Sequence, residues 1–388
     1  MKSSSAPRRV GVIDIGSGST SLAVFEAGGG GFLDRLHQEG DSLRLIEKID
    51  QTGALPASAV KQLFSSVGGY VRKARSLDVE AVHVVATSAM RDATNGSDLV
   101  KRMNEALGVT ARLISGEEEG QLAAHTVLCT LPMRDGIVLD LGGGSMQLVE
   151  VARRRVLRSV SLPLGALRLH DDFLRGSDPP SGAALCSLRR HVVEALRTVP
   201  WLCRHRGMLV AVGGSARSYG KMSRRERPVR TGHGHGFLLD GEAILDSYEV
   251  LSRKPTAARG ATPGLAAHRV DTIVAAGVVL SAVLRLGAFA GMHLSTYGIR
   301  EGVAFRALFG DVPIADPGGA GIRGRLRGVP MARPPVVAGL TPRERRLFAA
   351  ALDHKVERLL DKPIQGFWQE EVLRVARALE DGGSGAGA

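Results

Sequence analysis

Residues 12–26 read VIDIGSGSTSLAVFE, and residues 138–151 read VLDLGGGSMQLVEV. Each stretch begins with an apolar strand that ends in an aspartate, Asp14 or Asp140, and continues through a Gly/Ser turn into a second apolar strand. The two copies lie too far apart for a solenoid repeat, so they indicate a duplicated domain. We therefore predict two related domains that face each other across a cleft, each presenting a glycine hairpin.

Strand and helix patterns alternate around these hairpins. Apolar residues recur at helical or strand spacing, with turn residues between the runs. The predicted elements are a helix over 56–76, a strand over 81–86, a helix over 98–107, a strand over 110–114 and a helix over 117–129. A third strand-then-glycine segment, LVAVGGSARS, occupies residues 209–218. This alternation is typical of an α/β fold.

The length of 388 residues is enough for at least two domains. We predict an N-terminal domain over 1–128 and a second domain over 129–312, whose last helix, about 299–309, packs back on the first. Pro, Gly and Arg dominate 313–340, which indicates a linker. We expect 341–388 to form a short helical extension with a flexible tail.

The charge balance narrows the choice of partner. The 51 Lys and Arg exceed the 39 Asp and Glu, giving a net charge of +12. This surplus favours a polyanion, although a solvated basic surface is the alternative. An aromatic content of 4% argues against a stacking platform for nucleic acid, and no apolar run is long enough to span a membrane. Three scattered cysteines and the lack of a secretory signal favour a reducing cytoplasm.

The glycine loops have the chemistry of a phosphate site. Glycines let backbone N–H groups approach an anion, and serine hydroxyls add donors. The phosphate-binding candidates are Gly16, Ser17, Gly18 and Ser19 in the first loop, Gly142, Gly143, Gly144 and Ser145 in the second, and Gly213, Gly214 and Ser215 in the third. We expect Asp14 and Asp140 to face the same phosphate through a Mg²⁺ ion, since Mg²⁺ bound to phosphates takes one or two carboxylates. A purely conformational role for the glycines leaves the repeated aspartate unexplained.

Two further segments carry charged candidates. SGEEE at 115–119 opens a predicted helix, where acidic side chains are favoured by the helix dipole; one of the three glutamates could instead be a general base for an attacking water. Arg91, in ATSAMRDATN, could clamp a phosphate with its guanidinium group or pair with a nearby carboxylate. Arg300 and Glu301 could line the cleft or cap a helix. A P-loop is absent from the sequence, so the chain is not a P-loop NTPase.

Seven segments together resemble one family. They occur in a single order over about residues 9–309 and read VIDIGSGSTSLAVFE, ATSAMRDATN, LISGEEEGQLAAH, VLDLGGGSMQLVEV, SLPLGALRL, LVAVGGSAR and LSTYGIREGV. The chain resembles the exopolyphosphatase and guanosine pentaphosphate phosphohydrolase (Ppx/GppA) family of the actin and hexokinase-like superfamily. The resemblance implies two ribonuclease-H-like domains, a Mg²⁺-assisted removal of a terminal phosphate by water, Glu119 as the base, and a homodimer.

The sequence departs from the family pattern at three positions. Gly18 replaces an asparagine, Gly120 replaces an alanine, and Gln147 replaces a glutamate near the metal or the water. Related apyrases carry glutamine in a similar loop, which implies that Gln147 positions a water.

The motifs and the charge together predict an enzyme. We expect an exopolyphosphatase, a phosphoanhydride hydrolase that releases orthophosphate from inorganic polyphosphate. Guanosine pentaphosphate 5′-phosphohydrolase is the alternative within the same chemistry. A catalytically weak regulator that binds polyphosphate or a guanosine alarmone is the alternative outside it, and Gln147 is the residue that favours it.

Overall fold

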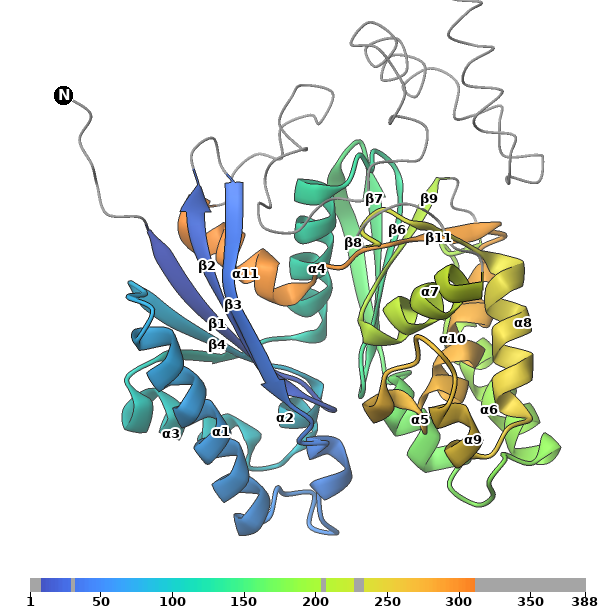
Figure 1. The fold of residues 1–388 in the computed structure, drawn as a ribbon, viewed down its shortest axis with the longest axis horizontal. Helices are drawn as coiled ribbons and strands as arrows, with labels where there is room; N and C mark the ends of the chain where they lie inside the picture. The colour runs from blue at the N-terminus through green and yellow to red at the C-terminus, as the bar shows by residue number, and fades with distance from the viewer. Residues whose placement is uncertain (1–7, 29–31, 204–206, 227–233, 311–388) are drawn as a thin grey trace, which may run out of the picture.

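The computed structural model describes residues 8–28, 32–203, 207–226 and 234–310. The predicted linker and helical extension lie outside the described residues. Within them the chain forms two mixed β-sheets with helices packed on their faces, as Figure 1 shows. The α/β class and the two related domains expected from the repeated hairpin are therefore confirmed.

The first sheet is built by the N-terminal third of the chain. Its strands are β1 (Arg9–Ile15), β2 (Thr20–Gly28), β3 (Phe32–Asp41), β4 (Ala81–Ala86) and β5 (Thr110–Leu113). They lie in the order β3-β2-β1-β4-β5. The β1–β2 and β2–β3 pairs are antiparallel, and the β1–β4 and β4–β5 pairs are parallel. The central strand β1 is thus the one that carries Asp14 at its carboxyl end.

The second sheet repeats this arrangement. Its strands are β6 (Gly136–Leu141), β7 (Met146–Ala152), β8 (Arg155–Leu162), β9 (Met208–Val212), β10 (Leu238–Asp240) and β11 (Gly291–Leu294). The order β8-β7-β6-β9-β11 matches that of the first sheet, strand direction included, and β10 adds an antiparallel edge. The sequence repeat is therefore a repeat of topology, with β6 and Asp140 in the place of β1 and Asp14.

Separate groups of helices bury the two sheets. The helices that connect strands of the first sheet are α1 (Ala57–Arg75), α2 (Ser88–Asp92) and α3 (Gly96–Leu107), with the 3₁₀ turn η1 (Leu45–Lys48) before α1. The strands of the second sheet are connected by α5 (Ala166–Phe173), α6 (Gly182–Arg197), α7 (Gly214–Glu226), α8 (Gly241–Ser252), α9 (Thr256–Gly260), the 3₁₀ turn η2 (Ala267–Arg269) and α10 (Ile273–Leu286). Each group closes its own apolar core, so each sheet has a rigid support.

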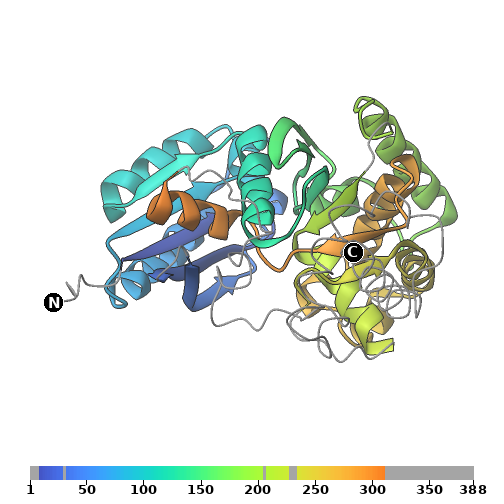
Figure 2. The ribbon, with the colours of Figure 1, turned by 90° about the horizontal axis from the view of Figure 1, so that it is seen from above.

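Two helices cross between the halves of the molecule. Helix α4 (Gly116–Thr130) follows β5 but packs against β6, β7 and β8. Helix α11 (Ile299–Phe309) follows β11 but packs on the first sheet, where Phe305 joins Val10 and Phe25. The two helices also contact each other, and Figures 1 and 2 show them between the sheets. The ends of β1 and β6 thus meet at one cleft. The domain boundaries at 128 and 312 stay predictions.

Candidate active site

The first two glycine loops have the same internal geometry. The Gly16 N–H donates to the Ser19 carbonyl at 3.0 Å, and the Gly142 N–H donates to the Ser145 carbonyl at 3.0 Å. A Cβ atom on Gly16 would lie 3.0 Å from the Ser19 carbonyl oxygen, and a Cβ atom on Gly142 would lie 3.1 Å from the Ser145 carbonyl oxygen. The duplicated sequence therefore folds into two copies of one turn.

The two loops also touch each other. A Cβ on Gly143 would lie 3.1 Å from the Gly18 nitrogen, and a Cβ on Gly144 would lie 2.4 Å from the Ser17 Oγ atom. Side chains at these positions are thus excluded by the facing loop rather than by the turn. The loops offer backbone N–H groups and serine hydroxyls, which is the chemistry that phosphate oxygens bind.

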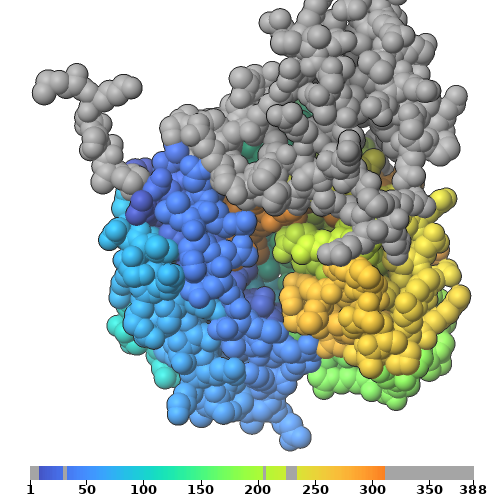
Figure 3. Space-filling view, viewed as in Figure 1, coloured from blue at the N-terminus to red at the C-terminus, as the bar shows by residue number. Residues whose placement is uncertain are grey.

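A cleft between the two halves contains most of the predicted residues, and Figure 3 shows the hollow at its mouth. It is lined by the candidates of the first two loops, by Gly213 and Gly214, and by Asp14, Asp140 and Glu119. Ser215 is buried in the first turn of α7 and does not line the cleft. Arg91 and Gln147 are also not among the residues that line the cleft.

Asp14 and Asp140 meet in this cleft from the two sheets. Loss of solvent raises the pKa of each carboxyl to about 6. The Arg300 charge opposes the shift at Asp14, and the Arg217 charge opposes it at Asp140, whose pKa the Asp14 charge raises further. The Asp14 Oδ1 atom is buried and accepts no hydrogen bond within the described residues. Two carboxylates beside a phosphate-type cradle, one of them with a free buried oxygen, fit a hard divalent cation such as Mg²⁺.

The structure distinguishes the three glutamates of α4. Glu117 is exposed, and Glu118 pairs with Arg112 at 2.7 Å on the surface. Glu119 is 6% exposed and lines the cleft. Burial raises the pKa of Glu119 to about 8, the Arg91 charge opposes this shift, and the Asp140 charge adds to it. A buried carboxyl with a pKa near neutrality is suited to proton transfer.

Arg91 pairs with this glutamate. Its Nη2 atom lies 2.8 Å from the Glu119 Oε2 atom and donates to the Ser145 hydroxyl at 3.4 Å, while Nη1 donates to the Ile114 carbonyl at 3.0 Å. From the sequence, Arg91 could either clamp a phosphate or pair with a nearby carboxylate. The structure shows the second contact, with Glu119 as the carboxylate. The role of Arg91 as a phosphate clamp stays a prediction.

Several cations of the second half line the cleft beside the loops. Arg217 and Arg269 were not singled out from the sequence, although Arg217 lies inside the LVAVGGSARS segment; no motif marks Arg269. Desolvation lowers the pKa of Arg269 to about 10, and the Arg217 charge adds to this. Arg300 also lines the cleft, and its Nη1 atom is buried without a hydrogen-bond partner among the described residues. Three guanidinium groups close together favour an anion between them.

The sequence comparison agrees with this geometry. The profile of the Ppx/GppA phosphatase family matches residues 23–309. The chain belongs to the Ppx/GppA phosphatase family. "Exopolyphosphatase 1" of Mycobacterium leprae is 28% identical over 305 residues, which cover 77% of this chain and 89% of that protein. "Exopolyphosphatase 2" of Mycobacterium tuberculosis is 29% identical, covering 76% of this chain and 97% of the relative.

Solved structures of the Ppx/GppA family share the fold. The Aquifex aeolicus family member is 25% identical, superposes with a TM-score of 0.68, and matches 78% of this chain and 98% of its own. An exopolyphosphatase from Cytophaga hutchinsonii, 22% identical, superposes with a TM-score of 0.71 and matches 79% of this chain and 99% of its own.

Among the described residues, no helix is both long and apolar enough to cross a membrane.

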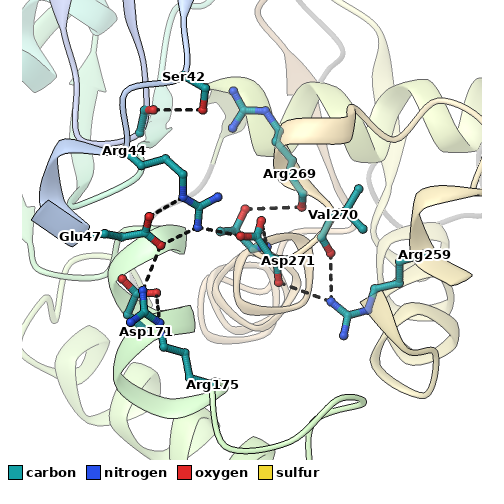
Figure 4. A network of polar contacts seen from close by, with 11 residues as sticks. Ser42, Arg44, Glu47, Asp171, Arg175, Arg259, Arg269, Val270 and Asp271 are labelled. Atoms are coloured by element: carbon teal, nitrogen blue, oxygen red, sulfur yellow. Dashed lines mark hydrogen bonds and ion pairs between the residues drawn. The ribbon is translucent and has the colours of Figure 1, made fainter. Parts of the chain in front are cut away.

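A network of ion pairs joins the two halves beside the site, as Figure 4 shows. Arg44, which follows β3, lies 2.5 Å from Glu47 in the first half and 2.6 Å from Asp271 in the second. Arg175, just after α5, reaches back to Glu47 at 3.1 Å. The Arg44 N–H also donates to the Gly18 carbonyl at 2.9 Å. The network therefore holds the first Ppx/GppA glycine loop against the opposite half of the molecule.

Two of the departures from the Ppx/GppA pattern lie in one packing contact. Gln147 is 1% exposed, and its side chain donates to Ser145 and Ser161. A Cβ on Gly120 would lie 2.6 Å from the Ser159 Oγ atom and 3.2 Å from the Gln147 Cβ atom. Glycine at position 120 therefore lets α4, with Glu119, approach β7 and β8 closely. The water-positioning role of Gln147 stays a prediction.

Proposed function

We propose that this protein is an exopolyphosphatase that releases terminal orthophosphate from inorganic polyphosphate by a Mg²⁺-dependent hydrolysis. The observation that carries the proposal is the position of Glu119, a buried carboxyl in a cleft whose other walls are two equivalent phosphate-type loops. A kinase of the same superfamily would need no such base for water. The exopolyphosphatase names of the matched relatives support the same chemistry.

The proposed reaction assigns a role to each part of the cleft. The loop N–H groups and serine hydroxyls hold the terminal phosphate, and Asp14 and Asp140 would hold Mg²⁺, which supplies positive charge to the phosphate oxygens. Glu119 accepts a proton from the attacking water as the new P–O bond forms. The P–O–P bond breaks, and the proton ends on the oxygen of the shortened chain or on the orthophosphate. Arg91 holds the Glu119 carboxylate in place by their ion pair.

The lining of the cleft favours a phosphate chain over a nucleotide. Among the described residues no Phe, Tyr or Trp lines it, and the imidazole of His268 is a smaller ring, so the lining offers little surface on which a guanine base can stack. Arg217, Arg269 and Arg300 instead offer guanidinium groups at which successive phosphates can bind. Guanosine pentaphosphate therefore remains the second candidate substrate.

A homodimer and a cytoplasmic location stay predictions.

The direct test is an assay of phosphate release. The purified full chain is given long polyphosphate, tripolyphosphate, guanosine pentaphosphate and ATP, each with and without Mg²⁺. We expect release from long polyphosphate with the highest kcat/KM, and only with the divalent cation. Preference for guanosine pentaphosphate would make the protein a phosphohydrolase of that nucleotide, and binding without release would make it a regulator.

The raised pKa values predict how Mg²⁺ stabilises the fold at different pH. Because the pKa values of Asp14 and Asp140 are about 6 and that of Glu119 is about 8, the folded state favours their protonated forms. The metal-free protein therefore loses stability as the pH rises from about 4 to about 8. Mg²⁺ binds the deprotonated aspartates, so two competing protons should weaken its apparent affinity about 100-fold at pH 5.

We accordingly expect Mg²⁺ to raise the thermal unfolding midpoint more at pH 8 than at pH 5. The measurement is thermal unfolding with and without Mg²⁺ at both values of pH. The Asp140→Asn variant is the control, because it lacks one of the two carboxylates and should show a smaller shift at pH 8. A shift of the same size at both pH values would contradict a cation site at these aspartates.

A further inference from the structure

The Ser145 hydroxyl of the second loop receives two hydrogen bonds from behind the cleft. The Gln147 Nε2 atom donates to Ser145 Oγ at 2.9 Å, and the Arg91 Nη2 atom donates to the same oxygen at 3.4 Å. Ser145 lines the cleft, whereas Gln147 and Arg91 do not. The second N–H of the Gln147 amide donates to Ser161 Oγ at 3.0 Å, so the amide is held from both sides.

These contacts determine what the hydroxyl can do. A serine hydroxyl accepts at two lone pairs and donates one O–H. At Ser145 the hydroxyl oxygen accepts from two N–H donors, one of Gln147 and one of Arg91. Neither N–H group can accept the hydrogen of the hydroxyl in return. The O–H is therefore free to donate to an acceptor in the cleft, and a phosphate oxygen is such an acceptor.

We propose that Gln147 is a positioning residue that acts through Ser145, fixing its hydroxyl as a donor aimed at the phosphate bound between the two glycine loops. The proposal deepens the proposed function and rests on it for the identity of the ligand, a phosphate chain. Gln147 lies directly opposite Asp140 across the β6–β7 pair and opposite Ser161 across the β7–β8 pair. Its place in the sheet thus puts the amide directly behind the loop.

The first loop has no such device. Ser21 occupies the position opposite Asp14 that Gln147 occupies opposite Asp140, and Ser21 itself lines the cleft. Ser19, the counterpart of Ser145, is exposed. The oriented hydroxyl is therefore a property of the second loop, produced by the glutamine at position 147.

A glutamate at position 147 would have the opposite effect. Its carboxylate accepts hydrogen bonds and donates none, so the Ser145 O–H would turn back to it and away from the cleft. The amide and the carboxylate have nearly the same shape, so packing would be kept while the hydrogen-bond direction and the charge both change.

The test is a double-mutant cycle of phosphate-chain binding. Gln147→Met and Ser145→Ala are made singly and together in the Glu119→Gln background, so that hydrolysis does not consume the ligand. The dissociation constant of tripolyphosphate is measured by calorimetry. We expect Ser145→Ala to weaken binding about 10-fold or more, as for loss of a hydrogen bond to a charged group. Gln147→Met should weaken it about 3- to 10-fold with Ser145 present and less than about 2-fold with alanine there, because the amide acts through the hydroxyl.

The matched control is Ser159→Ala on the same strand as Ser161, whose hydroxyl donates to the Glu117 carbonyl and not to the amide, and which should change the dissociation constant less than about 2-fold. Equal costs of Gln147→Met with serine and with alanine at position 145 would overturn the proposal. Should Gln147→Met not fold, Gln147→Leu replaces it in the cycle, because it is also uncharged and donates no hydrogen bond: its cost should again be much smaller beside Ser145→Ala, and equal costs would overturn the proposal.

Binding separates this proposal from the proposed function. If the chain released no phosphate from any substrate while residues 145 and 147 still showed coupling in binding, that result would support the positioning role and contradict the proposed exopolyphosphatase activity. No binding of tripolyphosphate by the chain carrying only Glu119→Gln would overturn the positioning role.

Discussion

Replacing Glu119 by glutamine is expected to lower the turnover of phosphate release by about 10²–10⁴-fold, the usual effect of losing a general base. The amide keeps the shape of the side chain but cannot accept the proton of the attacking water. Substrate affinity should stay the same or rise, because a negative charge near a polyanion is removed. The measurement is kcat and KM for polyphosphate at saturating Mg²⁺.

Two neighbouring glutamates are matched controls for this variant. Glu117 is exposed and Glu118 pairs with Arg112 on the surface, so both lie on the first turn of α4 but outside the cleft. Glu117→Gln and Glu118→Gln should each leave kcat within about 2-fold and cost at most about 1 kcal/mol of stability through the helix dipole. Near-normal turnover of Glu119→Gln, or an equal loss in Glu118→Gln, would overturn the assignment of the base.

Asp140→Asn should lower turnover by a similar factor, about 10²–10⁴-fold, if the cation supplies several kcal/mol of stabilisation to the reacting phosphate. The difference from Glu119→Gln lies in the response to metal. An amide oxygen is a weaker ligand for Mg²⁺ than a carboxylate, so a higher Mg²⁺ concentration should restore part of the lost rate. The measurement is the rate of phosphate release as a function of Mg²⁺ concentration.

Asp135→Asn is the control for this second variant. Asp135 directly precedes β6, the strand that carries Asp140, and accepts a hydrogen bond from the Arg153 N–H far from the cleft. Its substitution should leave the Mg²⁺ response unchanged. If Asp140→Asn kept the Mg²⁺ dependence of the unmodified chain, Asp140 would not hold the ion.

The apolar patterns of the sequence predict much of the fold because helices and strands place apolar residues at different spacings. The helix expected over 56–76 runs from Ala57 to Arg75, and the strand expected over 81–86 is β4. Strand β3 was not predicted, since its residues, FLDRLHQEGD, are mostly polar. Such a strand lies at the edge of its sheet and gains its structure from pairing with β2, which a local pattern does not reveal.

The site was predictable where chemistry repeats in the sequence and not where it depends on tertiary placement. The loops, Asp14, Asp140 and the group of glutamates all stand in motifs. Arg269 stands in none, because only the packing of the segment before α10 brings its guanidinium group to the cleft. The partner of Arg91 could not be chosen from the sequence either, since the choice depends on how α4 crosses to the second sheet.

The most direct test of the central claim, that water activated by Glu119 attacks the terminal phosphorus, is hydrolysis of polyphosphate in ¹⁸O-labelled water. Mass spectrometry of the orthophosphate released in the first turnover then shows where the oxygen of water ends. We predict that each released orthophosphate carries a single ¹⁸O atom and that the shortened chain carries none. Unlabelled orthophosphate, with the ¹⁸O on the end of the remaining chain, would contradict attack at the terminal phosphorus and the placement of the base.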